Sequence, residues 1–255
     1  MSIIIKSERE INLMKESGKV LIGLFKVLEE ATRPGISTKE LDTIAKNYII
    51  SFKGIPSTYG YEGYPGNICI SVNDTLIHGI PSKSIILKEG DIVTYDCMCT
   101  LNGYTTDAAR TFPVGQVSKV AQALIETSRK CFFEGVKLIK DGIHLGDVSE
   151  RIEAVAKENG FSLPEEYSGH GVGVNIHEDP YVPNTGVKNT GPILHKGMTL
   201  AIEPMICEGS PKTKVLSDGW TIKTRDGKLC SHYENTVVVT ATGYQIITLD
   251  EKENI

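Results

Sequence analysis

The stretch that decides the fold spans residues 90–110 and reads GDIVTYDCMCTLNGYTTDAAR. Two strand-like runs flank the Asn-Gly dipeptide at 102–103, which is the strongest short signal of a two-residue hairpin turn. Such a turn places Asp96 opposite Ala109. Asp107 is two residues from Ala109 on the same strand and therefore shares its face, so Asp96 and Asp107 are diagonal neighbours. The sequence thus predicts a hairpin with two carboxylates on one face.

The two aspartates can be explained in two ways. Two carboxylates side by side among apolar residues repel each other unless a positive charge neutralises them, and a metal ion is the simplest candidate. In the alternative, one aspartate ends a strand and the other is solvated on the open face. The hairpin alone leaves both explanations open.

Composition narrows the class of protein. The chain has 255 residues, of which 40% are hydrophobic and 23% charged, and its net charge of −5 argues against nucleic acid or anionic membrane as the main partner. No apolar run reaches the roughly 18–20 residues of a membrane helix, and the first residues lack the apolar core of a signal peptide. The six cysteines form no CxxC pair and are expected to be small buried residues. We expect a cytoplasmic protein with a single domain over residues 1–255.

Helix and strand signals follow one another along the chain. Ser7–Glu10 and Ser37–Glu40 are capping boxes, and apolar residues at spacings of three and four then give each helix one buried face. A long helix is expected over about 118–140, and a shorter one from Asp147 to before Gly160. The expected strands cover 68–72, 75–78, a strong strand at 198–206, and a final pair at 220–223 and 234–240.

The two halves of the chain repeat each other at one constant offset, which is the separation between Asp96 and Glu203. The repeat runs without a gap over about sixty residues, and each of these two acids lies six residues after a glycine. Glu234 opens a later strand much as Asp107 does, which requires an insertion of twenty residues after Ile206. The matched positions include Gly35 and Gly142, Leu41 and Val148, Leu87 and Leu194, Gly90 and Gly197, and Val93 and Leu200.

This duplication predicts an α+β fold. Two halves, roughly 1–115 and 116–255, would share one sheet with pseudo-two-fold symmetry and helices on its outer face. Two acids from each half would then meet at the middle of the sheet. Four carboxylates in one cleft need cations, and two divalent metal ions would neutralise them.

Three histidines have settings that favour a site. His170 lies in a Gly-His-Gly-Val-Gly segment, where the glycines let the backbone approach closely, although a surface loop is the simpler explanation for this residue alone. His177 follows seven residues later, a spacing that would put it on the opposite face of a regular strand unless a bulge intervenes. His78 ends an apolar strand and could equally be a core residue. The other histidines, His144, His195 and His232, are interpreted as surface residues.

These segments together resemble the type I methionine aminopeptidases over nearly the whole chain. The resemblance rests on six segments: Asn-Asp-Thr-Leu-Ile-His78-Gly-Ile-Pro, the Gly-Asp-Ile-Val-Thr-Tyr-Asp96 strand, Asp107, Gly-His170-Gly-Val-Gly with His177-Glu, Met-Thr-Leu-Ala-Ile-Glu203-Pro-Met, and Tyr-Glu234-Asn-Thr. It implies the pita-bread fold, with antiparallel strands at the centre. It also implies two divalent ions, of Co, Mn, Fe or Zn. Their ligands would be Asp96, Asp107, His170, Glu203 and Glu234, with Asp107 and Glu234 shared between the ions.

The same resemblance implies an activity and the residues that perform it. The substrate would be the initiator methionine of a nascent chain with a small second residue. Glu203 would carry a proton between water and the leaving amine, His177 would donate to the oxyanion, and His78 would contact the scissile amide. The methionine pocket would include Tyr61, Tyr64, Cys69, His78, His177 and Trp220. This chain departs from the family pattern at Thr58 and Ile176.

Two other functions remain to be compared. Xaa-Pro aminopeptidases and prolidases of this fold carry a large N-terminal domain, for which there is no room before Asp96. A non-enzymatic peptide-binding module is the second alternative, and it is disfavoured because all five ligand positions are present. We expect a monomer that meets nascent peptides, with transient ribosome encounters.

Overall fold

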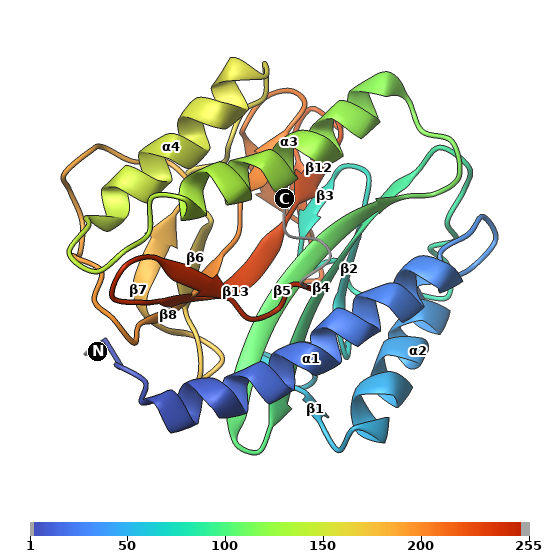
Figure 1. Ribbon diagram of the computed structural model, residues 1–255. Helices are drawn as coiled ribbons and strands as arrows, with labels where there is room; N and C mark the ends of the chain where they lie inside the picture. Colours follow the sequence, from blue (N-terminus) through green and yellow to red (C-terminus); the bar gives the residue numbers. More distant parts are fainter. Residues whose placement is uncertain (1–2, 251–255) are drawn as a thin grey trace.

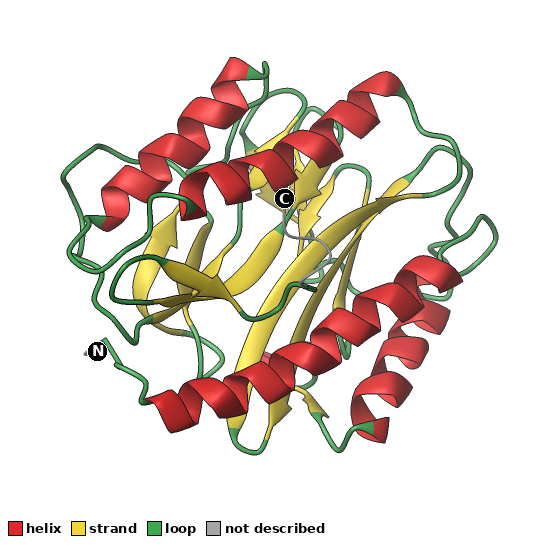
Figure 2. Ribbon diagram, viewed as in Figure 1, coloured by secondary structure: helices red, strands yellow, loops and turns green. Residues whose placement is uncertain are grey.

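Four helices lie on one face of the molecule in the computed structural model, which describes residues 3–250 (Figures 1 and 2). The helices α1 and α2 begin at the two predicted capping boxes. In each box the serine hydroxyl accepts from the third backbone N–H of the helix, and the glutamate accepts from the serine N–H. The four helices are α1 (Glu8–Ala31), α2 (Thr38–Ser51), α3 (Lys119–Val136) and α4 (Leu145–Glu158).

Two predicted helix ends were wrong. α3 stops at Val136 instead of Lys140, because Leu138 and Ile139 turn more tightly and bond to carbonyls three residues back. α4 begins at Leu145 rather than Asp147. Its first N–H groups bond to the carbonyls of Pro192 and Thr190, so a loop from elsewhere in the chain supplies the cap.

A nine-stranded antiparallel sheet lies behind the helices. Its order is β1-β4-β5-β13-β8-β6-β7, with β2 paired to β4 and β14 paired to β13. The predicted hairpin forms its core and is confirmed in register, since Asp96 lies opposite Ala109 and the turn at 102–103 has positive φ at both residues. The bounds are β1 (Ile55–Pro56), β2 (Cys69–Val72), β4 (Ile92–Leu101), β5 (Tyr104–Pro113), β6 (Ser168–Gly171), β7 (Glu178–Pro183), β8 (Thr199–Ile202), β13 (Glu234–Val239) and β14 (Tyr244–Ile246).

The constant offset between the halves is repeated in the hydrogen bonds. Gly35 N donates to Leu87 O at 2.8 Å, and at the equivalent positions of the second half Gly142 N donates to Leu194 O, also at 2.8 Å. Gly90 and Gly197 lie two residues before the equivalent strands β4 and β8, with φ of 90° and 91°. Because the same contacts recur at the same offset, the predicted duplicated fold is confirmed (Figure 1).

The strand register corrects one equivalence between the halves. In the first half, the paired residues Leu101 and Tyr104 are separated by the two turn residues 102–103. In the second half, Glu208 and Leu229 are the equivalent pair, because Glu208 N donates to Leu229 O, and twenty residues, 209–228, separate them. The insertion is therefore eighteen residues and not twenty. Met98 lies opposite Asp107, and the equivalent Met205 lies opposite His232. The counterpart of Asp107 is thus His232, and Glu234 corresponds to Ala109.

Two strand predictions in the second half were also wrong. The strand expected over 198–206 breaks at Pro204, which has no N–H to donate, and continues as β9 (Met205–Cys207). Strands do form near 220–223 and at 234–239, but they do not pair with each other. Instead β11 (Ile222–Thr224) pairs with β10 (Thr213–Val215) and with β3 (Thr75–Ile77), while β12 (Cys230–His232) pairs with β9.

The alternation of side chains along β4 separates core from site. Val93, Tyr95, Cys97 and Cys99 pack in the apolar cluster beneath α1 and α2. Asp96 points to the opposite face of the sheet. All six cysteines are buried and free, as expected. No helix within residues 3–250 is both long and apolar enough to span a membrane.

Candidate metal centre

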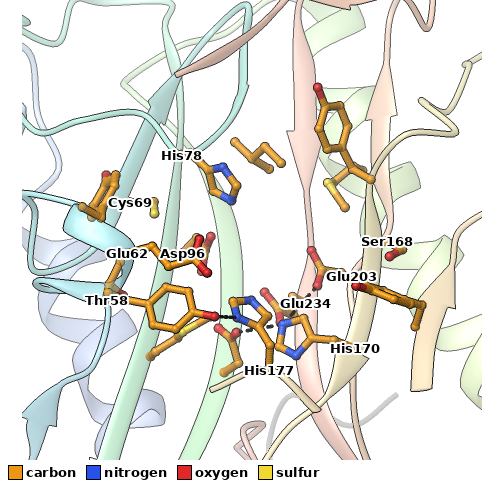
Figure 3. A pocket seen from close by; sticks show the side chains of 18 of the residues that line it. Thr58, Glu62, Cys69, His78, Asp96, Ser168, His170, His177, Glu203 and Glu234 are labelled. Atoms are coloured by element: carbon orange, nitrogen blue, oxygen red, sulfur yellow. Dashed lines mark hydrogen bonds and ion pairs between the residues drawn. The ribbon is translucent and has the colours of Figure 1, made fainter. Parts of the chain in front are cut away.

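A pocket of about 450 Å³ opens on the sheet face away from the helices. Both halves of the chain contribute to its wall, as Figure 3 shows for Asp96 on one side and Glu203 and Glu234 on the other. Every residue that the sequence predicted for the site lines this pocket. The structure therefore brings together side chains from distant parts of the sequence, from Thr58 to Glu234.

The four predicted carboxylates share strongly perturbed electrostatics. Burial raises the pKa of Asp107 from 3.8 to about 8, and only 1% of this residue is exposed. Burial, followed by repulsion from the other acids, likewise raises the pKa of Asp96, Glu203 and Glu234. Carboxyl groups that lie so close together cannot all be ionised unless a positive charge neutralises them. The cluster is therefore suited to cations.

His170 presents one ring nitrogen to these acids. Its Nδ1 lies 2.9 Å from the Gly171 carbonyl, which can only accept, so the Nδ1 proton donates and Nε2 keeps its lone pair. Nε2 lies 3.5 Å from an Asp107 carboxylate oxygen and 3.7 Å from one of Glu203. A carbonyl that fixes the tautomer in this way is typical of metal-binding histidines.

His177 reaches the same place by a chain reversal. The expected spacing argument assumed one strand, but His170 lies on β6 and His177 lies just before β7, which runs antiparallel to β6 with a register shift. The two imidazole centroids are 4.1 Å apart. His177 Nδ1 is 2.8 Å from the Tyr61 hydroxyl, which orients the ring within the pocket. Figure 3 shows His177 next to His170.

The opposite end of the pocket is aromatic and apolar. His78 has a positive φ of 57°, and its ring contacts Trp220 at 5.9 Å. Tyr64 also packs edge-on against Trp220, and Cys69 pairs with Asp96 across β2 and β4. Trp220 reaches His78 because the insertion of the second half, through β11, pairs with β3 of the first half. Thr58 lines this pocket as well, whereas Ile176 does not.

His232 was wrongly interpreted as a surface residue. It is 1% exposed, and its Nε2 lies 3.6 Å from carboxylate oxygens of both Glu203 and Glu234. Burial lowers its pKa to about 3, so the ring is neutral. The sequence held one signal for this position, since residues 232 and 234 share a face of a strand. His144 and His195 remain accessible to solvent, as predicted.

The residues present fit divalent metal ions. Asp107 Oδ1 and Glu234 Oε1 are buried without a hydrogen-bond partner among the described residues. Two groups of three donors, Asp107–His170–Glu234 and Glu203–His232–Glu234, each lie within 4.8 Å of one another. Mixed carboxylate and imidazole donors suit transition ions such as Mn, Fe, Co and Zn.

The chain is similar to known proteins over nearly its whole length. The model of metallopeptidase family M24 matches residues 12–241. A methionine aminopeptidase of Clostridium perfringens is 48% identical over 97% of this chain and 99% of its own. The crystal structure of a methionine aminopeptidase from Thermotoga maritima covers 98% of this chain and 100% of its own, at 39% identity and a TM-score of 0.96. A prolidase of Pyrococcus furiosus shares the fold at 22% identity and a TM-score of 0.77.

Proposed function

The chain belongs to metallopeptidase family M24, and we propose that it removes the N-terminal methionine from peptides, the activity for which its full-length relatives are named. The single observation that carries this is the convergence of Asp96, Asp107, His170, Glu203 and Glu234 in one pocket. The pita-bread fold and the antiparallel sheet are those of the relatives.

We propose that this pocket takes the initiator methionine of a nascent chain whose second residue is small. The methionine side chain would lie against the apolar wall formed by Tyr64, Cys69, His78 and Trp220, next to Tyr61 and His177. A thioether makes favourable contacts with aromatic ring edges, and the rings of Tyr64, His78 and Trp220 supply them on this wall.

Asp96, Asp107, His170, Glu203 and Glu234 would hold two divalent ions, with Asp107 and Glu234 shared. When bound, such ions supply Lewis acidity and make water nucleophilic near neutral pH. The ions would be Co, Mn, Fe or Zn, because mixed carboxylate and imidazole donors suit all four metals. The family membership supports metal use, and the donor geometry supports four of these five ligands, namely Asp107, His170, Glu203 and Glu234.

Three side chains would move or hold protons in the reaction. A carboxylate oxygen of Glu203 accepts the proton of the attacking water and passes it to the leaving amine. We propose that the Tyr61 hydroxyl, 2.8 Å from His177 Nδ1, donates to it, so that Nε2 carries the proton that His177 donates to the oxyanion. His78 lies on the opposite wall (Figure 3), where it would contact the nitrogen of the scissile amide and steady the leaving group.

We further propose that the two halves act as one catalytic domain. Each half contributes acids to the pocket, and β5 pairs with β13 at the seam, so neither half holds a complete ligand set. We also propose that the protein is a monomer, that it works in the cytoplasm, and that it meets ribosomes and nascent peptides only transiently.

Peptide hydrolysis tests the proposed substrate. Purified protein, supplied with Mn, Co or Fe, is assayed on Met-Ala-Ser, on a Met-Leu-Ser peptide and on an Xaa-Pro peptide. We expect release of free methionine from Met-Ala-Ser, much less from Met-Leu-Ser, and no cleavage of the Xaa-Pro bond. Cleavage of the Xaa-Pro peptide alone would indicate a prolidase-type enzyme, and no cleavage of any peptide by metal-loaded protein would favour a binding module.

A further inference from the structure

His232 is a buried histidine whose ring makes no hydrogen bond within the described residues. Both its Nδ1 and its Nε2 are buried without a partner. Buried polar atoms are almost always satisfied, so an orphaned ring beside carboxylates calls for a ligand-based explanation. Its backbone is held firmly on both sides. The Thr111 hydroxyl accepts from His232 N at 3.1 Å and donates to His232 O at 2.9 Å.

The distances around His232 repeat those around His170. His232 Nε2 lies 3.6 Å from Glu203 and 3.6 Å from Glu234, while His170 Nε2 lies 3.5 Å from Asp107 and 3.7 Å from Glu203. All four separations are too long for good hydrogen bonds. They suit donors that share an ion, because metal–ligand bonds of about 2.1 Å in a tetrahedron put donors about 3.4 Å apart.

The duplicated fold gives an independent reason to expect a ligand at this position. By strand register, His232 is the counterpart of Asp107, just as Glu203 is the counterpart of Asp96. Each half therefore offers two donors at equivalent positions on the site face. Glu234 and His170 then add to them from the second half.

We propose that Nε2 of His232 is an additional metal ligand, acting with Glu203 and Glu234 alongside the group Asp107–His170–Glu234. This inference rests on the proposed metal centre. The cluster would then hold two imidazoles, one on each side of the Glu203 carboxylate. A second nitrogen donor shifts preference toward transition ions and away from Mg and Ca.

The experiment uses full-length protein stripped of metal and reloaded with Co(II). In the proton NMR spectrum in water, each coordinated imidazole gives one exchangeable, paramagnetically shifted N–H signal. We expect two such signals in the wild type, and one each in His232→Gln and His170→Gln. By calorimetric titration, His232→Gln should bind Co(II) at least about tenfold more weakly than the wild type. His195→Gln, at an exposed histidine, serves as the matched control and should leave both readouts unchanged.

The outcomes separate this inference from the proposed metal centre. One shifted imidazole signal in the wild type, or unchanged Co(II) affinity and spectrum in His232→Gln, would overturn the role of His232. The wild-type spectrum gives its answer even if the variant folds poorly. Unchanged binding in His170→Gln would instead contradict the metal centre itself.

Discussion

Glu203 occupies the position on which the proposed proton transfer depends. One of its carboxylate oxygens faces His170 at 3.7 Å and the other faces His232 at 3.6 Å. Glu203→Gln keeps the size of the side chain but cannot accept a proton. We expect kcat for Met-Ala-Ser to fall by about 10²–10⁴-fold.

The test of Glu203→Gln measures kcat together with metal content, so that loss of metal and loss of proton transfer are distinguished. Glu208→Gln lies just beyond β9, outside the pocket, and should retain wild-type turnover. A metal-loaded Glu203→Gln with near-wild-type kcat would remove the proton-carrying role.

At the level of single residues, local motifs made most of the site predictable. Asp96 and Asp107 were found because a two-residue turn fixes which strand positions face each other. His232 was missed because its burial depends on a partner strand far along the chain, β9, which no local pattern around it indicates. His177 was expected to need a bulge, since the reversal between β6 and β7 lacks a strong turn signal.

Among the elements, capping boxes and glycines predicted boundaries well where the stabilising contacts are local. The starts of α1 and α2 were correct because both partners of each box lie within four residues. The start of α4 and the strand break at Pro204 were predicted wrongly, because each depends on contacts with carbonyls or strands that are distant in the sequence. The pairing of β11 with β3, which brings Trp220 into the pocket, was not predicted either, because the two strands are far apart in the sequence.

The segment before α1 fastens the loop that carries His177. Lys6 forms a buried ion pair with Glu178, and these side chains are 1% and 2% exposed. The other carboxylate oxygen of Glu178 accepts from Asn175 N at 2.9 Å. Lys6→Met leaves Glu178 charged and buried without its partner, so we expect a loss of about 3–5 kcal/mol in the free energy of unfolding, measured by denaturant titration.

A matched control and a double variant isolate the Lys6 effect. Lys19→Met breaks an exposed pair with Glu16 and should change stability little. Lys6→Met with Glu178→Gln removes both charges and should recover much of the loss. If Lys6→Met proves as stable as Lys19→Met, the buried pair does not anchor this segment.

At the scale of the whole molecule, the duplication decides where the site lies. β5 of the first half pairs with β13 of the second, and Arg110 on β5 donates to Asn235 Oδ1 at 2.6 Å across the seam. The constant offset between the halves made this architecture predictable, because an identical spacing of glycines sets the same turns twice. The exact insertion length was not predictable, since only the strand register determines it.

The metal-free protein should lose stability as the pH rises from about 6.5 to 8. Folding raises the pKa of Asp107 from 3.8 to about 8 and also raises those of the other three acids, so the native state binds more protons than the unfolded chain in this range. The free energy of unfolding then falls by roughly 1.4 kcal/mol per pH unit for each such carboxyl.

Below pH 6.5 the buried histidines oppose this trend. Burial lowers the pKa of His170 to about 4 and that of His232 to about 3, so below pH 6.5 the unfolded chain binds more protons on these two rings, which offsets part of the carboxyl effect. Denaturant unfolding with a chelator should therefore show the steepest loss of stability between pH 6.5 and 8, where the histidines no longer offset the carboxyls, and Asp107→Asn should flatten that decline. Bound divalent ions favour ionised carboxylates and should abolish that decline. Metal-free stability that stays level or increases between pH 6.5 and 8 would mean that these acids titrate normally, and the electrostatic argument for a cation cage would fail with it.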